Sequence, residues 1–196
     1  MMQQPVIKPD VLHESSMGIQ LVPITDELLS RREVMLDREI DGGFASSLCS
    51  QLIYLAREDP DKEITVWVDS PGGSVASGLA VYDVMRLISC PIRTVCMGTA
   101  ASMAAVLFAA GNTRLMMPHS RVMIHDPRIP NTGGTALELD AIAQDIMRTR
   151  QAMASILAEH TGKTVDEILE KTKSDTFFSA EEAIEFGLAD SVMEGV

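Results

Sequence analysis

Short apolar patterns typical of strands alternate with helical patterns from Arg32 to Ala110, and this alternation limits the possible fold more than any other feature. Because strand and helix follow one another with short joints, the chain predicts a mostly parallel α/β sheet with helices on its faces. Two further short strands are expected around Pro118. The expected strands are 34–36, 64–68, 92–97, 114–117 and 121–124, and the expected helices are 44–58, 79–88 and 102–110.

A long helix is predicted in the second half of the chain. Residues 126–134 form a loop rich in Pro and Gly, and an apolar stripe at helical spacing then runs from Ala136 to His160. The mean helix has about 11–12 residues, so we expect this longer one to project or to pack on another subunit. Two short helices follow, each preceded by a capping box: Thr164 with Glu167, and Ser179 with Glu182.

Residues 1–30 are weakly patterned. Prolines and glycines interrupt any regular element there, so we expect a flexible or adaptable N-terminal arm ahead of one domain, residues 31–196. The first residues carry charges and no apolar run, which argues against a secretory signal. The longest apolar stretch, around Met103–Ala110, falls short of the about 20 residues that span a bilayer. We expect no membrane association.

Composition excludes several classes of partner. Hydrophobic residues make up 46% of the 196 residues, enough for the core of one domain. Only 16 Lys and Arg stand against 28 Asp and Glu, and with no basic stripe to neutralise phosphates we expect no nucleic-acid partner.

Cys49, Cys90 and Cys96 match no zinc spacing. We therefore expect reduced, buried thiols in a cytoplasmic protein that needs no metal and no cofactor.

The surroundings of Ser102 in CMGTAASMAA make this residue a candidate nucleophile. A buried strand runs into Gly98, the chain turns through small residues, and an apolar helix begins. The hydroxyl then lies at a helix N-terminus, where free N–H groups favour an oxyanion. A plain N-cap serine is the alternative interpretation.

The turn Ser70-Pro71-Gly72-Gly73 after the second strand offers backbone donors for such an oxyanion. Glycines have no Cβ, so their backbone approaches other groups closely. Paired N–H donors stabilise the charge that develops in acyl transfer. An ordinary strand-to-helix turn explains the same residues without any chemistry.

Among four histidines, His125 is the best candidate for a general base. It closes the apolar run VMI at a strand end, where α/β sheets gather their sites. A core or edge histidine is the alternative. Spacing cannot select an orienting carboxylate among 28 acids; Asp175 is a candidate, whereas neighbouring side chains in an extended segment point apart, which argues against Asp126.

Five separated blocks resemble the proteolytic subunit of the Clp protease, the ClpP family, between Arg32 and Met193. The blocks are SPGGSVASGLAVYDVM, CMGTAASMAAVLFAAG, PHSRVMIHDP, HTGKT and FFSAEEAIEFGLAD. By resemblance, the catalytic residues are Ser102, His125 and Asp175, the oxyanion-hole N–H groups belong to Gly73 and Met103, and the substrate-binding residues are Gly72, Pro127, Arg128 and Ile129.

The resemblance also implies an architecture and partners. The fold would be an α/β, crotonase-like spiral of repeated βαβ units with residues 136–160 as a projecting handle helix. Subunits of such proteins form a double heptameric ring, with themselves or with a ClpP paralogue, and an AAA+ unfoldase ATPase of the Clp type feeds them unfolded polypeptides. The implied activity is that of a serine endopeptidase working through an acyl-enzyme, with Pro127–Thr135 pairing to the substrate main chain.

Some features depart from the family. The arm 1–30 lacks the sequence associated with axial loops, and Thr65 and Trp67 stand where tyrosines often contribute to the ATPase dock. The main alternative function is a structural or conditionally active subunit that works only in a hetero-oligomer with an active paralogue. A crotonase-type acyl-CoA enzyme is a third and weaker hypothesis, because such enzymes do not need a Ser-His-Asp set.

Overall fold

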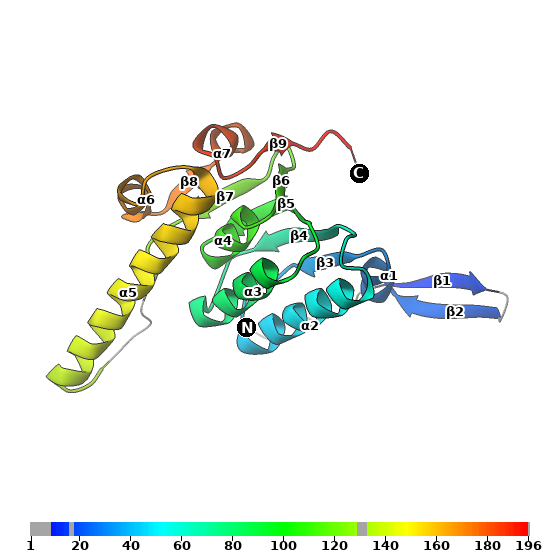
Figure 1. The fold of residues 1–196 in the computed structure, drawn as a ribbon, viewed down its shortest axis with the longest axis horizontal. Coiled ribbons are helices and arrows are strands. Elements are labelled where there is room, and N and C mark those ends of the chain that lie inside the picture. Colours follow the sequence, from blue (N-terminus) through cyan, green and yellow to red (C-terminus); the bar gives the residue numbers. More distant parts are fainter. Residues whose placement is uncertain (1–8, 16–17, 129–132, 196) are drawn as a thin grey trace.

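A seven-stranded sheet forms the centre of the molecule, in the order β3-β4-β5-β6-β9 with β7 beside β5 and β8 beside β7 (Figure 1). The computed structural model describes residues 9–15, 18–128 and 133–195. Among the described strands of this sheet, β7 and β8 alone pair antiparallel. The strands are β3 (Glu33–Leu36), β4 (Ile64–Ser70), β5 (Ile92–Ala101), β6 (Thr113–Met116), β7 (Arg121–Ile124), β8 (Thr176–Phe178) and β9 (Ser191–Val192).

Three helices, α2, α3 and α4, lie side by side in one layer against the sheet (Figure 1). Every residue of α4 is buried, so this helix is the centre of the core. The prediction of a mostly parallel α/β fold with helices on the sheet is therefore confirmed. The helices are α1 (Ile24–Ser30), α2 (Gly42–Glu58), α3 (Val75–Leu87), α4 (Met103–Ala109), α5 (Ala136–Thr161), α6 (Val165–Thr172) and α7 (Ala180–Phe186).

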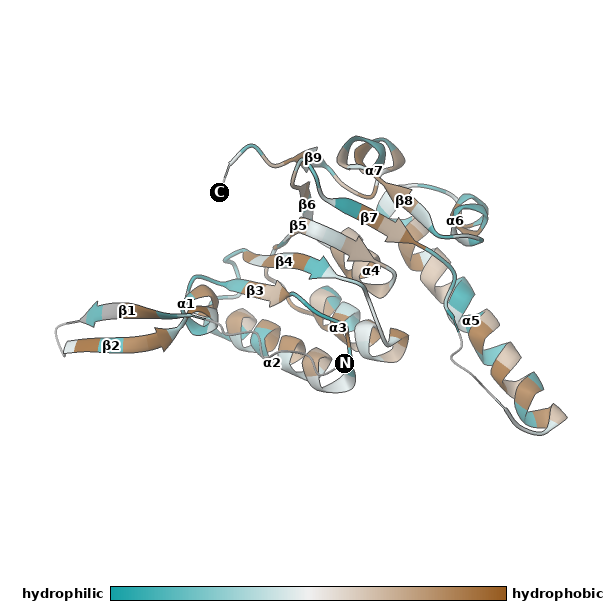
Figure 2. Ribbon diagram, turned by 180° about the vertical axis from the view of Figure 1, so that it is seen from behind, coloured by the Kyte–Doolittle hydropathy of each residue, from teal (hydrophilic) through white to brown (hydrophobic). Residues whose placement is uncertain are grey.

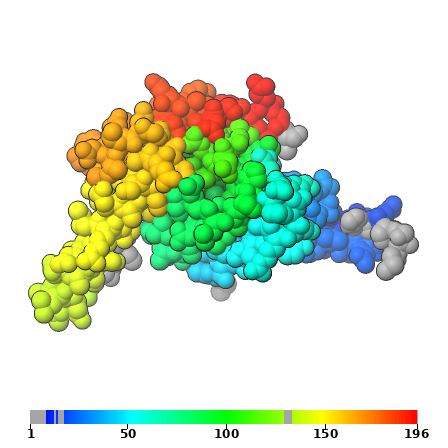
Figure 3. Space-filling view, viewed as in Figure 1, coloured from blue at the N-terminus to red at the C-terminus, as the bar shows by residue number. Residues whose placement is uncertain are grey.

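The long helix α5 projects from the body of the molecule, as the sequence predicts (Figure 3). A capping box between Thr135 and Glu138 fixes its start, and Gly162, at φ 70°, ends it in the left-handed conformation. Near its end, Ala154 and Leu157 are buried against the core. Its first turns instead contain hydrophobic residues far from the sheet (Figure 2), and Leu137 among them is 83% accessible.

The N-terminal segment is more regular than the sequence indicates. Strands β1 (Asp10–Ser15) and β2 (Gly18–Pro23) pair antiparallel, and α1 follows directly. The expectation that Pro and Gly interrupt regular structure was wrong within the described residues, because Pro9, Gly18 and Pro23 lie at the ends of these strands. The hairpin extends away from the sheet (Figure 2), and Leu12, Ile19 and Leu21 on it are exposed.

Helices α6 and α7 begin at the two predicted capping boxes, Thr164 with Glu167 and Ser179 with Glu182. Strands β8 and β9, between and after them, were not predicted. Of the three free thiols, Cys90 and Cys96 are buried and Cys49 is half-buried. Across the described ranges, no helix is long and apolar enough to cross a membrane.

Candidate active site

Ser102 lies where β5 ends and α4 begins, and its backbone is strained. Its φ is 56° and its ψ −122°, a left-handed conformation that a non-glycine residue rarely adopts. Its N–H donates to the carbonyl of Met123 on β7, at 2.8 Å, and its side chain makes no capping hydrogen bond. A plain N-cap serine would show that bond. The strain instead presents the hydroxyl at the end of the sheet, as strained residues at functional sites do.

Gly72 packs directly against this serine. Its φ is 91°, and a Cβ at this position would lie 2.6 Å from the Ala101 carbonyl oxygen and 2.8 Å from Ser102 Cβ. The structure therefore requires glycine here for two reasons, conformation and close approach. The turn predicted to offer oxyanion donors and the predicted nucleophile are in contact.

Gly73 is fixed by the loop that follows β3. Ile40 donates its N–H to the Gly72 carbonyl at 2.7 Å, and Ser74 donates its N–H to the Ile40 carbonyl at 2.8 Å. A Cβ on Gly73 would lie 2.4 Å from that same Ile40 carbonyl oxygen. The backbone of Gly73 is thus held on one side, while its other side lines the groove in front of α3. Met103, the other predicted donor, is the first residue of α4, where N–H groups have no partner within the helix.

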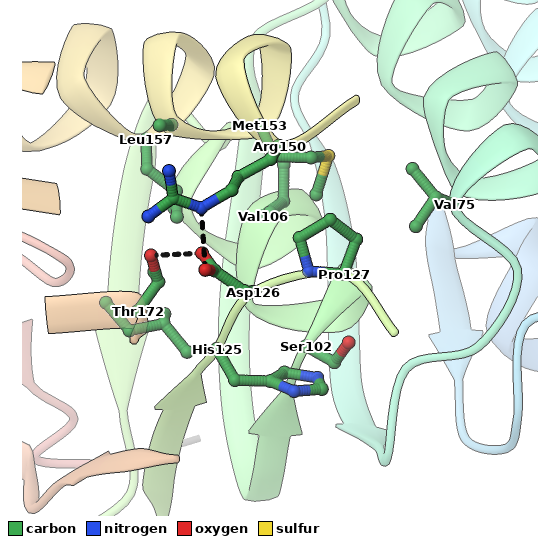
Figure 4. A pocket seen from close by; sticks show the side chains of 12 residues that line it. Val75, Ser102, Val106, His125, Asp126, Pro127, Arg150, Met153, Leu157 and Thr172 are labelled. Atoms are coloured by element: carbon green, nitrogen blue, oxygen red, sulfur yellow. Dashed lines mark hydrogen bonds and ion pairs between the residues drawn. The ribbon is translucent and has the colours of Figure 1, made fainter. Parts of the chain in front are cut away.

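Strand pairing brings the predicted base next to the predicted nucleophile. Strands β5 and β7 are parallel neighbours with Ala101 opposite Met123, so Ser102 and His125 leave the sheet at the same end. Figure 4 shows the imidazole of His125 beside the Ser102 side chain. Carboxyl ends of parallel strands are the usual place for sites in such sheets.

The third predicted residue reaches the site through the antiparallel pairing of β7 with β8. In this register Val122 faces Phe178, Met123 faces Phe177 and Ile124 faces Thr176. One step further along the same register, His125 faces Asp175. The His125 Nδ1 and Asp175 Oδ1 atoms are 3.6 Å apart, just beyond hydrogen-bond range.

The charge state of His125 follows from its surroundings. Its side chain is 12% exposed, and burial is the main reason that its pKa lies below the ordinary histidine value. The guanidinium of Arg128 lowers the pKa further, whereas Asp175 and Asp126 act in the opposite direction. A neutral imidazole, the form that accepts a proton, is favoured.

Asp126 turns away from His125, as the alternation of side chains in an extended segment predicts. Its carboxylate accepts hydrogen bonds from Arg150 Nε at 2.6 Å and from the Thr172 hydroxyl at 2.7 Å (Figure 4). Its N–H donates to the Thr172 carbonyl at 2.8 Å. The residue after the histidine is therefore tied to α5 and α6.

Sequence reasoning missed this connection, although a signal was present. Arg150 interrupts the apolar stripe of the long helix, four residues after Ile146 and three before Met153. A charged residue on a buried face needs a partner of opposite charge. The adjacent pocket behind Ser102 and His125 is lined by Arg150, Met153 and Leu157 of this helix (Figure 4).

A larger groove of about 630 Å³ lies beside the site. It is lined by residues of α3, by residues of α5, and by Pro127 and Arg128. These are two of the predicted substrate-binding residues; the third in that segment, Ile129, lies outside the described residues. The groove is mostly apolar and runs past Gly73, so it can take an extended peptide with apolar side chains.

The other histidines lie elsewhere. His160, near the end of α5, makes a 3.2 Å hydrogen bond with the hydroxyl of Tyr82 on α3. His119 lies in the turn between β6 and β7. In the part of the chain that the structure describes, no cluster of three or more His, Cys, Asp or Glu side chains could hold a metal ion.

Comparison with known families gives the class of the protein. The sequence model of the family described as Clp protease matches residues 16–196. The chain belongs to the Clp protease family. It is a serine endopeptidase of the ClpP type, which confirms the resemblance found in the sequence. Clp proteases are ring-forming peptidases that work with Clp ATPases. The match begins within the predicted N-terminal arm, and the division of the chain at residue 30 stays a prediction.

Proposed function

We propose that Ser102, His125 and Asp175 form the catalytic triad of this Clp protease. The observation that carries the proposal is the strand pairing, because parallel β5–β7 and antiparallel β7–β8 deliver the three residues to one end of the sheet. His125 takes the Ser102 proton as the hydroxyl attacks the peptide carbonyl, and it donates this proton to the leaving amine. Water then hydrolyses the acyl-enzyme and frees Ser102.

The N–H groups of Gly73 and Met103 hold the oxyanion in this mechanism. Support comes from the contact of Gly72 with Ser102 and from the bonds that fix the Gly72–Ser74 backbone on Ile40. Donors that are fixed before the reaction stabilise developing charge without reorganisation. The segment from Pro127 to Thr135, of which residues 129–132 lie outside the described part of the chain, pairs with the main chain of the substrate in this proposal, which gives broad specificity for unfolded polypeptides.

In the cell the subunits form a double heptameric ring, and an AAA+ ATPase of the Clp type unfolds and feeds the substrate. Support comes from the exposed apolar side chains on α5, among them Leu137 and Met147. Exposed apolar area of this kind marks a surface that another molecule covers. Related copies of α5 meeting between two rings would cover it.

A second candidate function is a subunit that is active only beside an active paralogue. The observation that favours it is the 3.6 Å separation of His125 Nδ1 from Asp175 Oδ1, because the triad of the single subunit is not closed. Contacts in a mixed ring would then close it. Peptidase assays of the purified chain, with and without a paralogue, separate the two functions.

The triad is tested with a fluorophosphonate, which labels activated serines. We expect stoichiometric labelling of Ser102, no labelling of Ser102→Ala, and normal labelling of Ser50→Ala, whose exposed hydroxyl bonds only its own helix. His125→Ala should lower kcat almost as much as Ser102→Ala, by about 10⁴–10⁶, since triad residues act as a unit. Full labelling of Ser102→Ala would exclude Ser102 as the nucleophile.

A further inference from the structure

The acid and the base of the proposed triad are close to each other but not joined. His125 Nδ1 is buried and has no hydrogen-bond partner. The nearest carboxylate oxygen, Asp175 Oδ1, is 3.6 Å away. A buried ring nitrogen without a hydrogen-bond partner is unfavourable. Another interaction of Asp175 must therefore compete with its hydrogen bond to His125.

Arg128 makes that competing interaction. Its Nη2 donates a hydrogen bond to Asp175 Oδ1, the same oxygen that lies nearest His125 Nδ1. Arg128 follows His125 by three residues, on the segment that leaves β7 and lines the groove. A charge-assisted bond from a guanidinium competes effectively with a bond from a neutral imidazole for one acceptor.

We propose that Arg128 is a positioning residue that draws Asp175 away from His125 in the resting subunit. The working triad forms when the Arg128 guanidinium leaves the carboxylate and His125 Nδ1–H donates to it instead. This inference rests on the proposed function, because it assigns a resting and a working arrangement to the same three residues.

Burial indicates how strong this control is. The side chain of Arg128 is 69% exposed and that of Asp175 40% exposed. Solvent screens such a pair, and exposed ion pairs shift an equilibrium by only about two- to fivefold. Arg128 therefore moderates the enzyme and does not switch it off, and the pair can open during each catalytic cycle.

Three charged groups shift the pKa of His125, and they act in different directions. Arg128 lowers the pKa of His125 after the larger effect of burial, and Asp175 and Asp126 raise it. Arg150 on α5 holds Asp126 at 2.6 Å, so that carboxylate stays fixed when Arg128 changes. Removal of Arg128 should therefore raise the pKa of His125 and improve its bond to Asp175 together.

The test compares the assembled parent protein with Arg128→Leu, using a short fluorogenic peptide with apolar residues. We expect kcat to rise by about two- to fivefold while the acidic limb of the kcat–pH profile moves to higher pH. A loss of packing alone would lower kcat without moving this limb. Arg128→Lys keeps the charge and should leave the limb near its parental position.

Arg57→Leu is the matched control, because it removes the same exposed charge from the last turn of α2. It should change neither kcat nor the pH profile. A crystal structure of Arg128→Leu gives a readout independent of activity: the Nδ1–Oδ1 distance should shorten from 3.6 Å into hydrogen-bond range.

The possible failures are distinct. If the parent is active and the kcat of Arg128→Leu does not exceed the parental kcat at any pH, the role of Arg128 is wrong and the triad is unaffected. The same holds if the crystal structure of Arg128→Leu retains the 3.6 Å gap. A parent and variants that neither cleave peptides nor take the fluorophosphonate at Ser102 would overturn the triad and this role with it.

Discussion

Arg150 Nε on α5 lies 2.6 Å from the Asp126 carboxylate, in the residue that directly follows His125. Both side chains are mostly buried, 22% and 31% exposed, and the Thr172 hydroxyl also donates to Asp126. The projecting helix and the base of the proposed triad are thus connected by one side-chain bond. A displacement of α5 would therefore change the position of His125.

Arg150→Met should therefore lower both stability and activity. The change leaves a partly buried carboxylate without its cation, which costs about 2 kcal/mol in the free energy of unfolding. Chemical denaturation measures this cost, and kcat should fall because His125 loses its support. A double-mutant cycle with Asp126→Asn isolates the pair. Strictly additive effects of the two substitutions would contradict a direct coupling between them.

Gly72→Ala should nearly abolish peptide hydrolysis while Ser102 remains present. The new Cβ would collide with the Ala101 carbonyl oxygen at 2.6 Å and with Ser102 Cβ at 2.8 Å, at a φ of 91° that disfavours alanine. The displaced turn would move an oxyanion donor, a loss of about 10²–10³ in kcat. Gly195→Ala, where nothing lies within 4 Å, is the control. Parental kcat in Gly72→Ala would show that this contact has no catalytic importance.

Much of the fold could be predicted from the sequence because its signals are local. Each strand and helix between residues 34 and 124 carries its own apolar period, and the observed bounds differ from the expected ones by only a few residues. The β1–β2 hairpin was missed for a physical reason. Its exposed residues, such as Leu12 and Leu21, show no buried face, and prolines at strand ends resemble breaks in a strand.

The candidate site was likewise predictable only where its signals are local. Ser102 and His125 could be proposed as candidates from the sequence because each directly follows a strand with a buried pattern. Asp175 could not be selected from the residues alone, since its position depends on the register of β8, a strand of 3 residues that was not predicted. The contact between Arg128 and Asp175 depends on side-chain placement, which no spacing in the sequence encodes.

The activity should persist at lower pH than an ordinary histidine would allow. Burial, and then Arg128, lower the pKa of His125, and the base works only when neutral. A lowered pKa keeps the neutral form present at lower pH, so the acidic limb of kcat/KM should have its midpoint below about 6.5. Light scattering at each pH ensures that the rings stay assembled. A midpoint above that value would mean that Asp175 dominates over burial.

Arg32 should contribute more to stability than any surface arginine. Its side chain is buried, 3% exposed for the whole residue, at the end of α2. The guanidinium donates to four carbonyl oxygens, those of Leu55, Asp59, Lys62 and Glu63, at 2.9–3.2 Å. Arg32→Met fills similar space but leaves these acceptors without a donor.

We expect Arg32→Met to lower the free energy of unfolding by about 3 kcal/mol, since each unsatisfied buried acceptor costs about 1–3 kcal/mol and water partly compensates at the rim. Arg32→Lys should lie between the parent and Arg32→Met, because an ammonium cannot reach all four carbonyls at once. Arg57→Met on the exposed end of α2 should change stability by less than about 0.5 kcal/mol. Denaturant titration of the three variants gives this order, and equal effects of Arg32→Met and Arg57→Met would show that the buried guanidinium contributes no more than an exposed one.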